Sequence, residues 1–260
     1  MTFFWNADPE LIRLGSLAIR WYGLLYALSF LFGTLLMSWM FRRENKPPET
    51  IDRLLIYMLV AVVVGARLGE TLFYHPSFFF QHPLEIFKVW KGGLSSHGGV
   101  IGILLALYIY SRKTPDQSFL WILDRICLVV ALGGTLIRIG NFFNSEIIGI
   151  PTHSNWGVVF QRIDNLPRHP AQLYESATYF ILFLILITVY RSVDTTKYKG
   201  ILAGLFLSIG FTSRFFIEFV KENLVFRDSE VILNMGQRLS IPVILLGLFL
   251  LARLAWKKNQ

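Results

Sequence analysis

The chain has 260 residues, of which 54% are hydrophobic, and its mean hydropathy is clearly positive. This composition is more apolar than an ordinary soluble domain allows, so it predicts an integral membrane protein. The formal net charge of +8 is then explained by membrane topology and by contact with anionic lipid headgroups, and it does not indicate a nucleic-acid partner.

Seven stretches of the chain are apolar enough to cross roughly 30 Å of hydrocarbon as helices, which takes about 20 residues each. The first stretch lacks a basic segment before it and an evident cleavage site, so we interpret it as a retained helix and not as a signal peptide. The third is short and glycine-rich, as close packing between membrane helices permits. The stretches are residues 18–41, 54–74, 95–111, 117–138, 172–190, 200–220 and 236–255. They predict an all-α, polytopic membrane protein with seven transmembrane helices that form one domain over residues 1–260.

Basic residues are unevenly distributed between the connections of these stretches. The connections after the first, third and fifth stretches and the tail after the seventh are richer in lysine and arginine than the others. Cytoplasmic loops of membrane proteins are enriched in these two residues. The N-terminus is therefore expected outside and the C-terminus in the cytoplasm.

Two connections on the expected outer side are too long for simple turns, and both are predicted to be extracytoplasmic. They are residues 75–94 and 141–170. In the first, HPLEIFKVWKGG places Leu84, Phe87 and Trp90 on one broad helical face, which is typical of a short helix lying in the membrane interface. An ordinary loop anchored by aromatic side chains explains this pattern equally well. In the second, the β-like run from Trp156 to Phe160 lies between two prolines, which predicts a small extracytoplasmic cap.

Charged side chains and a histidine interrupt the apolar stretches. An arginine or aspartate costs at least about 2.5 kcal/mol at the bilayer centre, so this many of them indicate a polar site within the membrane. For Arg125 beside Asp124, and for Arg20 near the outer interface, a structural role as an ion-paired or snorkelling residue explains the position equally well. The set comprises Arg20, Arg67, His97, Asp124, Arg125, Arg138, Arg214, Glu218 and Arg238.

Three of these residues, Arg138, Arg214 and Glu218, fall at the expected outward ends of the fourth and sixth helices. Arg214 and Glu218 are four residues apart, so they share a helix face and can form an ion pair that leaves other guanidinium donors for an anion. Guanidinium suits phosphate, because its planar fork donates two parallel, charge-assisted hydrogen bonds. With Arg138, in the run IRIGNFFNSEIIG, they predict a site for a phospholipid headgroup or a phosphate leaving group in the outer half of the membrane.

His97 lies in GGLSSHGGVIG, where glycines on both sides let backbone or substrate come close. A histidine can take up a proton near neutral pH, which makes His97 a candidate base, although a lone histidine is more often a hydrogen-bonded core residue. His169 has the same ambiguity, and the proline after it favours a structural turn. The histidines are scattered, and HExxH, CxxC, GxSxG and P-loop patterns are missing, so neither a metal nor a cofactor is expected.

Seven motifs together resemble the bacterial prolipoprotein diacylglyceryl transferases, and the resemblance runs nearly from end to end of the chain. The most specific is RIGNFFN with its downstream glutamate and glycine, whereas WYG or HGG alone would be weak. The motifs are WYG from Trp21, GARLG from Gly65, GGLSSHGG around His97, RIGNFFNSEIIG from Arg138, RHPAQLYE from Arg168, RFFIE from Arg214 and MGQRLSIP from Met235.

The resemblance implies an enzyme of the bacterial cytoplasmic membrane with its active site toward the outer leaflet. It would move the diacylglyceryl group of phosphatidylglycerol onto the lipobox cysteine thiol of a prolipoprotein and release glycerol 1-phosphate. Its partners would be phosphatidylglycerol, the prolipoprotein lipobox segment and membrane lipids. A site for this reaction must deprotonate the thiol, neutralise the departing phosphate and exclude water.

The resemblance also implies roles for individual residues. His97 would be the base, Arg138 and Arg214 would bind the phosphate, and Glu218 would orient Arg214. The remaining positions expected at the phosphatidylglycerol site are Tyr22, Asn141, Glu146 and Gly149. The chain departs from the family at Ile137, which stands where glycine usually precedes the motif arginine and would crowd a closely packed helix.

Two alternatives accompany this interpretation. The thiol can lose its proton late, as the arginines draw off the phosphate, in which case electrostatic stabilisation replaces a strong base. The other alternative is a non-enzymatic phospholipid or anion transporter with arginines along its path. Transporters often contain internal repeats or paired broken helices, and the sequence contains neither.

Overall fold

The computed structural model describes residues 3–15, 17–222 and 233–258, and most of this part of the chain is helical. Its internal contacts divide into two compact units. Unit 1 comprises Met1–Leu36 and Asp124–Gln260, and unit 2 comprises Met37–Leu123. That the chain forms a single domain stays a prediction, and each unit is described by itself.

The helices follow the predicted stretches with shifted ends. Between them, the described residues form two π-helical turns, Glu70–Tyr74 and Phe206–Gly210, and three 3₁₀ turns, Pro83–Phe87, Val89–Lys91 and Glu218–Val220. The α-helices are α1 Trp21–Arg43, α2 Glu49–Gly69, α3 Pro76–Gln81, α4 Ser96–Lys113, α5 Phe119–Phe143, α6 Ala171–Ser192, α7 Ile201–Leu205, α8 Phe211–Ile217 and α9 Met235–Lys258.

Five helical segments of the described chain are long and apolar enough to cross a membrane. They are α1, α5, α6, the run Ile201–Val220 that contains α7 and α8, and α9. These segments support an integral membrane protein built of helices. The predicted count of seven is not confirmed, because α2 and α4 lie outside this set: α2 carries Asp52, Arg53 and Arg67, and α4 ends in Arg112 and Lys113.

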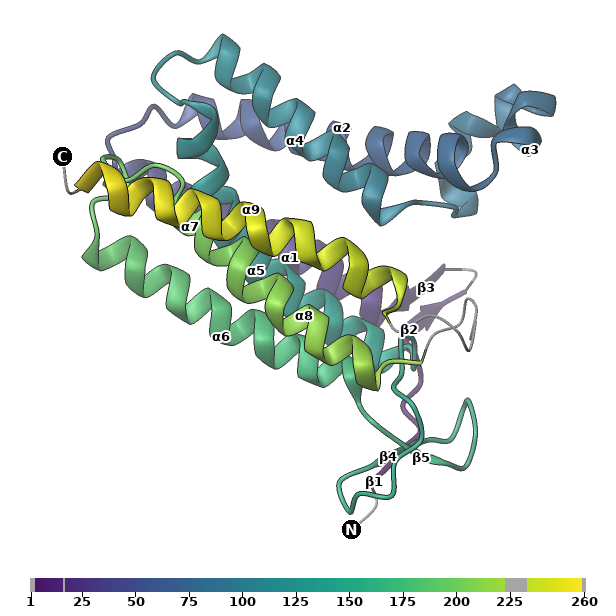
Figure 1. Cartoon of the computed structure of the whole chain (residues 1–260). Coiled ribbons are helices and arrows are strands. Elements are labelled where there is room, and N and C mark those ends of the chain that lie inside the picture. Colours follow the sequence, from purple (N-terminus) through teal and green to yellow (C-terminus); the bar gives the residue numbers. More distant parts are fainter. Residues whose placement is uncertain (1–2, 16, 223–232, 259–260) are drawn as a thin grey trace. The chain divides into compact units, whose positions relative to one another are not determined.

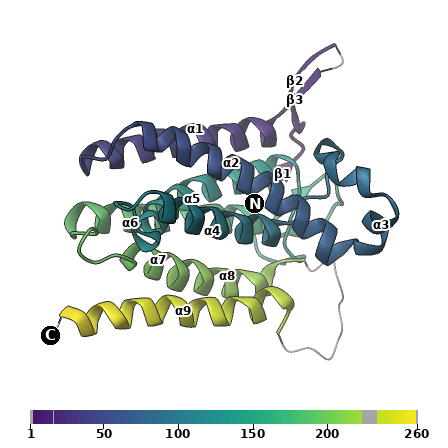
Figure 2. The ribbon, with the colours of Figure 1, turned by 90° about the horizontal axis from the view of Figure 1, so that it is seen from above.

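In unit 1, α9 lies alongside the run that contains α7 and α8, and α6 flanks the same run (Figures 1 and 2). Two glycines let α9 approach closely. A Cβ on Gly204 would stand 2.8 Å from a methyl carbon of Leu251, and one on Gly247 would stand 2.5 Å from the Ser208 hydroxyl. This backbone-level contact is the small-residue packing that membrane helices favour.

Asp124 and Arg125 have structural roles at the opposite end of α5 from Arg138. The Asp124 carboxylate accepts hydrogen bonds from the backbone N–H groups of Gly200 (2.7 Å) and Ala203 (2.8 Å), so it caps the start of α7. The Arg125 guanidinium donates to the Thr195 hydroxyl at 3.1 Å. Both side chains are fully buried. The structure therefore supports the structural explanation for this pair.

The N-terminal residues form strands where the sequence predicts the beginning of a helix. β2 (Glu10–Leu14) pairs antiparallel with β3 (Leu17–Arg20), and α1 begins only at Trp21, so the prediction of a helix from residue 18 is wrong. Gly15 has a φ of 61°, which permits the tight reversal between the two strands. Arg20 consequently lies at the end of a hairpin that precedes α1 (Figure 2) and not within the helix.

The predicted β-like run is confirmed as part of a small sheet. β4 (Val158–Phe160) pairs parallel with β1 (Phe3–Trp5) and antiparallel with β5 (Pro167–Arg168). The sheet gathers at the end of unit 1 where α6 begins (Figure 1). Its apolar core joins the end of α5, because Phe142 packs with Ile148, Val158, Phe160 and Trp5.

In unit 2, α2 and α4 pack backbone against backbone through two Gly-xxx-Gly pairs. The first pair is Gly65 and Gly69 on α2, and the second is Gly98 and Gly102 on α4. A Cβ on Gly69 would stand 2.6 Å from the Gly98 Cα, and one on Gly65 would stand 2.6 Å from the Gly98 carbonyl oxygen. Side chains at these positions would separate the helices.

We expect Gly98→Ala to lower the free energy of unfolding by about 1–3 kcal/mol, because the added methyl would collide with the backbone of Gly65 and Gly69. Gly99→Ala is the matched control, since a Cβ there would stand at an ordinary 3.8 Å from Ala66. Thermal melting of the two variants in detergent measures the difference. Equal melting temperatures would contradict the backbone contact.

The connection after Tyr74 is not one interface helix. It contains α3 and two 3₁₀ turns, which Lys88 separates with a non-helical backbone conformation. Leu84 and Phe87 lie three residues apart in the first turn and so share its face, and Trp90 lies in the second turn. All three side chains are about three-quarters exposed. The exposed apolar side chains expected from the sequence are thus present, on two short turns and not on one helix.

Arg67 binds the main chain of this connection. Its buried guanidinium stacks over Phe79 at 4.9 Å. It donates hydrogen bonds of 2.5–3.0 Å to the carbonyl oxygens of Glu85, Ile86, Gly92 and Gly93. The Glu85 carbonyl also accepts from the Lys88 N–H at 3.1 Å, so it is shared between Arg67 and the 3₁₀ turn. Arg67 is therefore committed to the main chain of unit 2.

Candidate active site

Arg138 is the centre of a charged network at the end of α5. Its Nε lies 2.8 Å from Glu175 Oε2 of α6 in an ion pair, and its Nη1 donates a hydrogen bond to Asn141 Oδ1 at 3.0 Å. The side chain of Arg138 is 17% exposed and that of Glu175 only 5%. The buried ion pair ties the Arg138 guanidinium to α6 as well as to its own helix.

Asn141 links Arg138 to Glu146. Its side-chain amide donates to Glu146 Oε2 at 3.2 Å, while Asn144 donates to the other carboxylate oxygen at 3.1 Å. The chain reverses here, because Ser145 and Ile147 on either side of Glu146 have φ values of 56° and 57°. The reversal turns Glu146 back toward the helix that carries Arg138. The structure thus brings together three of the predicted site residues, Arg138, Asn141 and Glu146.

Lys221 extends the network to the segment after α8. Its ammonium group lies 3.1 Å from Glu175 Oε1 and 3.4 Å from Glu218 Oε2. Glu218 packs closely on Gly236 of α9, where a Cβ would stand 2.8 Å from the Glu218 carboxyl carbon. Lys221 and Glu175 therefore connect Glu218 to Arg138.

The predicted ion pair between Arg214 and Glu218 is wrong, since the Glu218 carboxylate contacts Lys221 instead. The i, i+4 relation assumes a continuous α-helix. α8 ends at Ile217, and Glu218 begins a 3₁₀ turn, which changes the angle between the two side chains. Arg214 is half-buried, and it has neither a hydrogen bond nor an ion pair with any other described residue.

The charges of the network do not cancel among its members. Two cations, Arg138 and Lys221, face three carboxylates, Glu146, Glu175 and Glu218, which leaves the connected groups one negative charge in excess. An anion would be repelled by that excess. Arg214 lies on α8 of the same unit, and its guanidinium is uncommitted among the described residues.

Gly149 provides a close backbone approach, as expected, and its partners are protein segments. Its N–H donates to the His169 carbonyl at 2.9 Å, and it forms a bridge with Lys221. A Cβ at this position would stand 2.5 Å from the His169 carbonyl oxygen and 2.6 Å from that of Val220. Glycine thus allows the loops before α6 and after α8 to meet beside the network. His169 has the structural role that its following proline favours.

Arg168 ties the same loops together. Its buried guanidinium donates to the Gly149 carbonyl at 3.1 Å and pairs with Glu222 at 3.0 Å and with Asp164 at 2.6 Å. The hydrogen bonds from Arg168 hold the pKa of Asp164 below its ordinary value. The ionised form of Asp164 therefore stabilises the folded cap.

This pKa shift predicts that the cap weakens in acid. A carboxyl group with a lowered pKa contributes stability that is fully present above its ordinary pKa, near 4, and is lost as the pH falls through the lower folded value. We expect hydrogen exchange at residues 157–168, corrected for its intrinsic pH dependence, to accelerate below about pH 4. Asp164→Asn should exchange faster at neutral pH and approach the original protein in acid. A difference that is independent of pH would contradict the role of Asp164.

Tyr22 lies against α5, the helix that carries Arg138, and Ile137 is part of that helix. The ring of Tyr22, at the start of α1, packs on Gly140, where a Cβ would stand 3.0 Å from it. Tyr22 is thus next to Asn141 in the fold without a hydrogen bond to the described residues. Ile137 is half-buried, and Arg138 beside it keeps both of its contacts.

His97 belongs to unit 2 and lies in the first turn of α4. It is exposed, and its Nδ1 is 3.2 Å from the Tyr74 hydroxyl. The expected proximity of His97 to Arg138 and Arg214, which belong to unit 1, stays a prediction.

Glu175 and Lys221 are the two network members that the sequence analysis missed. Glu175 is a buried carboxylate within a membrane-length apolar helix, so the cost of burying a charge was a usable signal for it. It is also the last residue of the motif RHPAQLYE. Lys221 carried no comparable signal, because it lies just beyond its apolar stretch.

A groove of about 590 Å³ is formed by the start of α6 and the end of α8. It is lined mainly by apolar groups of these two segments, together with Trp156 of the loop between α5 and α6. Two of its lining residues, Tyr174 and Val220, directly precede Glu175 and Lys221 in the chain. The segments that form the groove therefore also carry these two members of the network.

These features define an integral membrane protein with a buried charged network at one end of its helices. A family model described as prolipoprotein diacylglyceryl transferase matches residues 9–253. The chain therefore belongs to the prolipoprotein diacylglyceryl transferase family.

Individual relatives match over nearly their whole length. A phosphatidylglycerol–prolipoprotein diacylglyceryl transferase of Tolumonas auensis is 49% identical over 99% of both chains. One of Chloroherpeton thalassium is 50% identical over 95% of this chain and 92% of its own, and one of Bacteroides fragilis is 38% identical over 98% and 96%. The similarity thus includes every segment that contributes to the network.

Proposed function

We propose that this protein transfers the diacylglyceryl group of phosphatidylglycerol to the lipobox cysteine thiol of prolipoproteins and releases glycerol 1-phosphate. The observation that carries the proposal is the 49% identity, over 99% of both chains, to a protein named for this transfer. The buried network around Arg138 supplies a physical reason, because the reaction needs cations at the departing phosphate.

In the proposed reaction, the thiol sulfur forms a bond to the glyceryl carbon as the bond from that carbon to the phosphate oxygen breaks. The electron pair of the broken bond leaves with the phosphate. Arg138, oriented by Glu175 and Asn141, and Arg214, whose guanidinium is uncommitted among the described residues, bind this phosphate. Preorganised donors of this kind stabilise the charge that develops in the transition state. Glu218 acts through Lys221 and not by orienting Arg214.

The thiol proton goes to His97 in this proposal. His97 is exposed at the start of α4, so its ring is accessible to a substrate. Loss of the proton late in the reaction, driven by the arginines alone, is the competing route. Tyr22, Asn141, Glu146 and Gly149 line or shape the headgroup site, and the apolar groove beside Tyr174 takes part of an acyl chain.

We further propose the membrane arrangement that the distribution of basic residues favours. Seven helices cross the bacterial cytoplasmic membrane, with α2 and α4 added to the five apolar segments, the N-terminus outside and the C-terminus in the cytoplasm. The network and the small sheet then face the outer leaflet, where the lipobox segment of an exported prolipoprotein meets phosphatidylglycerol.

The test is a reaction with the purified protein. It is incubated with phosphatidylglycerol and a lipobox peptide, and mass spectrometry follows the peptide while an enzymatic assay follows glycerol 1-phosphate. We expect the diacylglyceryl mass increase on the cysteine and an equal amount of glycerol 1-phosphate, and neither with a Cys→Ser peptide. Absence of both products would refute the proposed function.

A further inference from the structure

The structure places a tyrosine against the ring of His97. Tyr74 is the last residue of the π-helical turn Glu70–Tyr74 that ends α2, and its hydroxyl lies 3.2 Å from His97 Nδ1. A π turn inserts an extra residue per turn and so changes the direction of the side chains that follow. Such turns frequently occur at functional sites. Nδ1 is therefore the nitrogen of His97 that contacts protein, and Nε2 has no hydrogen-bond partner among the described residues.

The backbone on both sides of this contact is held firmly. Ser95 caps α4, since its Oγ accepts from the Gly98 N–H at 3.3 Å, and its own N–H donates to the Ala66 carbonyl at 2.9 Å. Gly98 packs on the backbone of α2, and Arg67 binds the carbonyls of the two glycines just before this cap. The main chain of His97 is thus fixed relative to α2, and the ring is the part that Tyr74 constrains.

A neutral imidazole carries one N–H, and the partner of one nitrogen decides which nitrogen carries it. If the tyrosine donated to Nδ1, Nε2 would keep the hydrogen and be unable to accept a proton. If Nδ1–H donates to the phenol oxygen, Nε2 is unprotonated and can act as a base. The second arrangement also survives proton transfer, because the imidazolium still donates from Nδ1 to the same oxygen.

We propose that Tyr74 is a positioning residue for His97, which accepts a hydrogen bond from Nδ1–H and leaves Nε2 to take the proton of the substrate thiol. The proposal rests on the proposed function for the identity of the substrate. In the step itself, the S–H bond breaks, its electron pair stays on the sulfur, and the proton forms a bond to Nε2. Tyr74 does not touch the reacting atoms.

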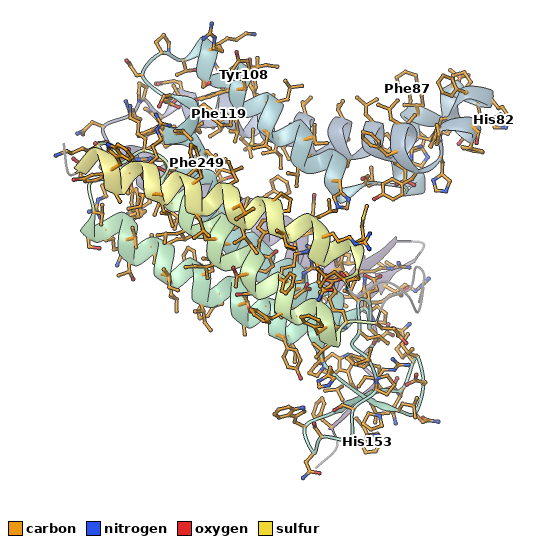
Figure 3. All side chains as sticks on the ribbon, in the orientation of Figure 1. His82, Phe87, Tyr108, Phe119, His153 and Phe249 are labelled. Carbon is orange, nitrogen blue, oxygen red and sulfur yellow. The ribbon has the colours of Figure 1, made fainter. Side chains whose placement is uncertain are left out.

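Two variants and one spectrum test the proposal. Tyr74→Phe removes only the hydroxyl, and Tyr108→Phe is the matched control, an exposed tyrosine on α4 at the opposite end of unit 2 from Phe87 and His82 (Figure 3). Turnover is measured against phosphatidylglycerol concentration with the lipobox peptide. The ring nitrogens of ¹⁵N-histidine-labelled protein are recorded by NMR, and His97→Gln assigns the His97 signals.

We expect the original protein and Tyr108→Phe to have His97 protonated at Nδ1. Tyr74→Phe should shift the ring toward the other tautomer and lower kcat by about tenfold, less than the 10²–10⁴-fold typical of losing a base, with KM for the lipid unchanged. A His97 protonated at Nε2 in the original protein would overturn the proposal, whether or not Tyr74→Phe folds. Unchanged kcat in folded Tyr74→Phe would also overturn it. The NMR spectrum reports the tautomer of His97 without any turnover. A protein that forms no product would therefore refute the proposed function, while the spectrum still tests the hydrogen bond of Tyr74.

Discussion

Arg138→Ala is expected to reduce kcat/KM for diacylglyceryl transfer by about 10³-fold. Loss of a single preorganised donor at a developing negative charge typically costs 10²–10³-fold, and Arg138 offers a full positive charge as well. Arg138→Lys keeps that charge but loses the planar fork that contacts Glu175 and Asn141 together, so an intermediate loss is expected. Initial rates at several phosphatidylglycerol concentrations measure both effects.

The control for Arg138 is Arg162→Ala, which removes an exposed arginine from the cap. It should keep the original kcat/KM and the original melting temperature. If Arg138→Ala remained folded and kept more than about a tenth of the activity, the role of Arg138 at the leaving phosphate would be wrong.

Glu175→Ala is expected to lower the free energy of unfolding by about 3–5 kcal/mol and to remove most activity. Its carboxylate bridges Arg138 and Lys221 at 2.8 and 3.1 Å, and its side chain is only 5% exposed. Removing one member of a buried ion pair leaves the partner charges uncompensated, which is far more costly than removing an exposed pair. Thermal and chemical unfolding in detergent measure the loss.

Glu10→Ala is the matched control for Glu175→Ala, because Glu10 pairs with Arg13 in the exposed β2 strand at 2.6 Å. Its loss should change the free energy of unfolding by no more than about 1 kcal/mol. If both variants melted alike, Glu175 would not be the residue that holds Arg138 in place.

The sequence indicated several charged and polar residues of the site region, but it did not predict which groups they contact. The run RIGNFFN indicated Arg138 and Asn141, and the cost of charge in hydrocarbon indicated Arg214 and Glu218. The predicted ion pair between Arg214 and Glu218 was wrong, because their spacing assumes a regular helix and α8 ends before Glu218. Glu175 could have been found as a charged residue within an apolar helix. The position of Lys221 is determined by the path of the chain after α8, which the sequence does not indicate.

The fold was predictable to a similar extent. Apolar length located the helices, and a β-like run between two prolines located β4. The N-terminal hairpin was missed because the end of β3 is apolar up to Arg20 and runs directly into the helix that follows. The segment after α3 is bound by Arg67, whose partners lie 18 to 26 residues farther along the chain. Contacts of this range leave no local pattern in the sequence.

The central claim is that the network around Arg138 binds the phosphate of phosphatidylglycerol, and native mass spectrometry of lipid retention tests it most directly. The purified protein, Arg138→Ala and Arg162→Ala are each released from detergent that contains equal amounts of phosphatidylglycerol and a neutral diacylglycerol. We predict that the original protein and Arg162→Ala retain phosphatidylglycerol preferentially, and that folded Arg138→Ala loses this preference. Equal preference for phosphatidylglycerol in all three proteins would show that Arg138 does not bind the phosphate of this lipid.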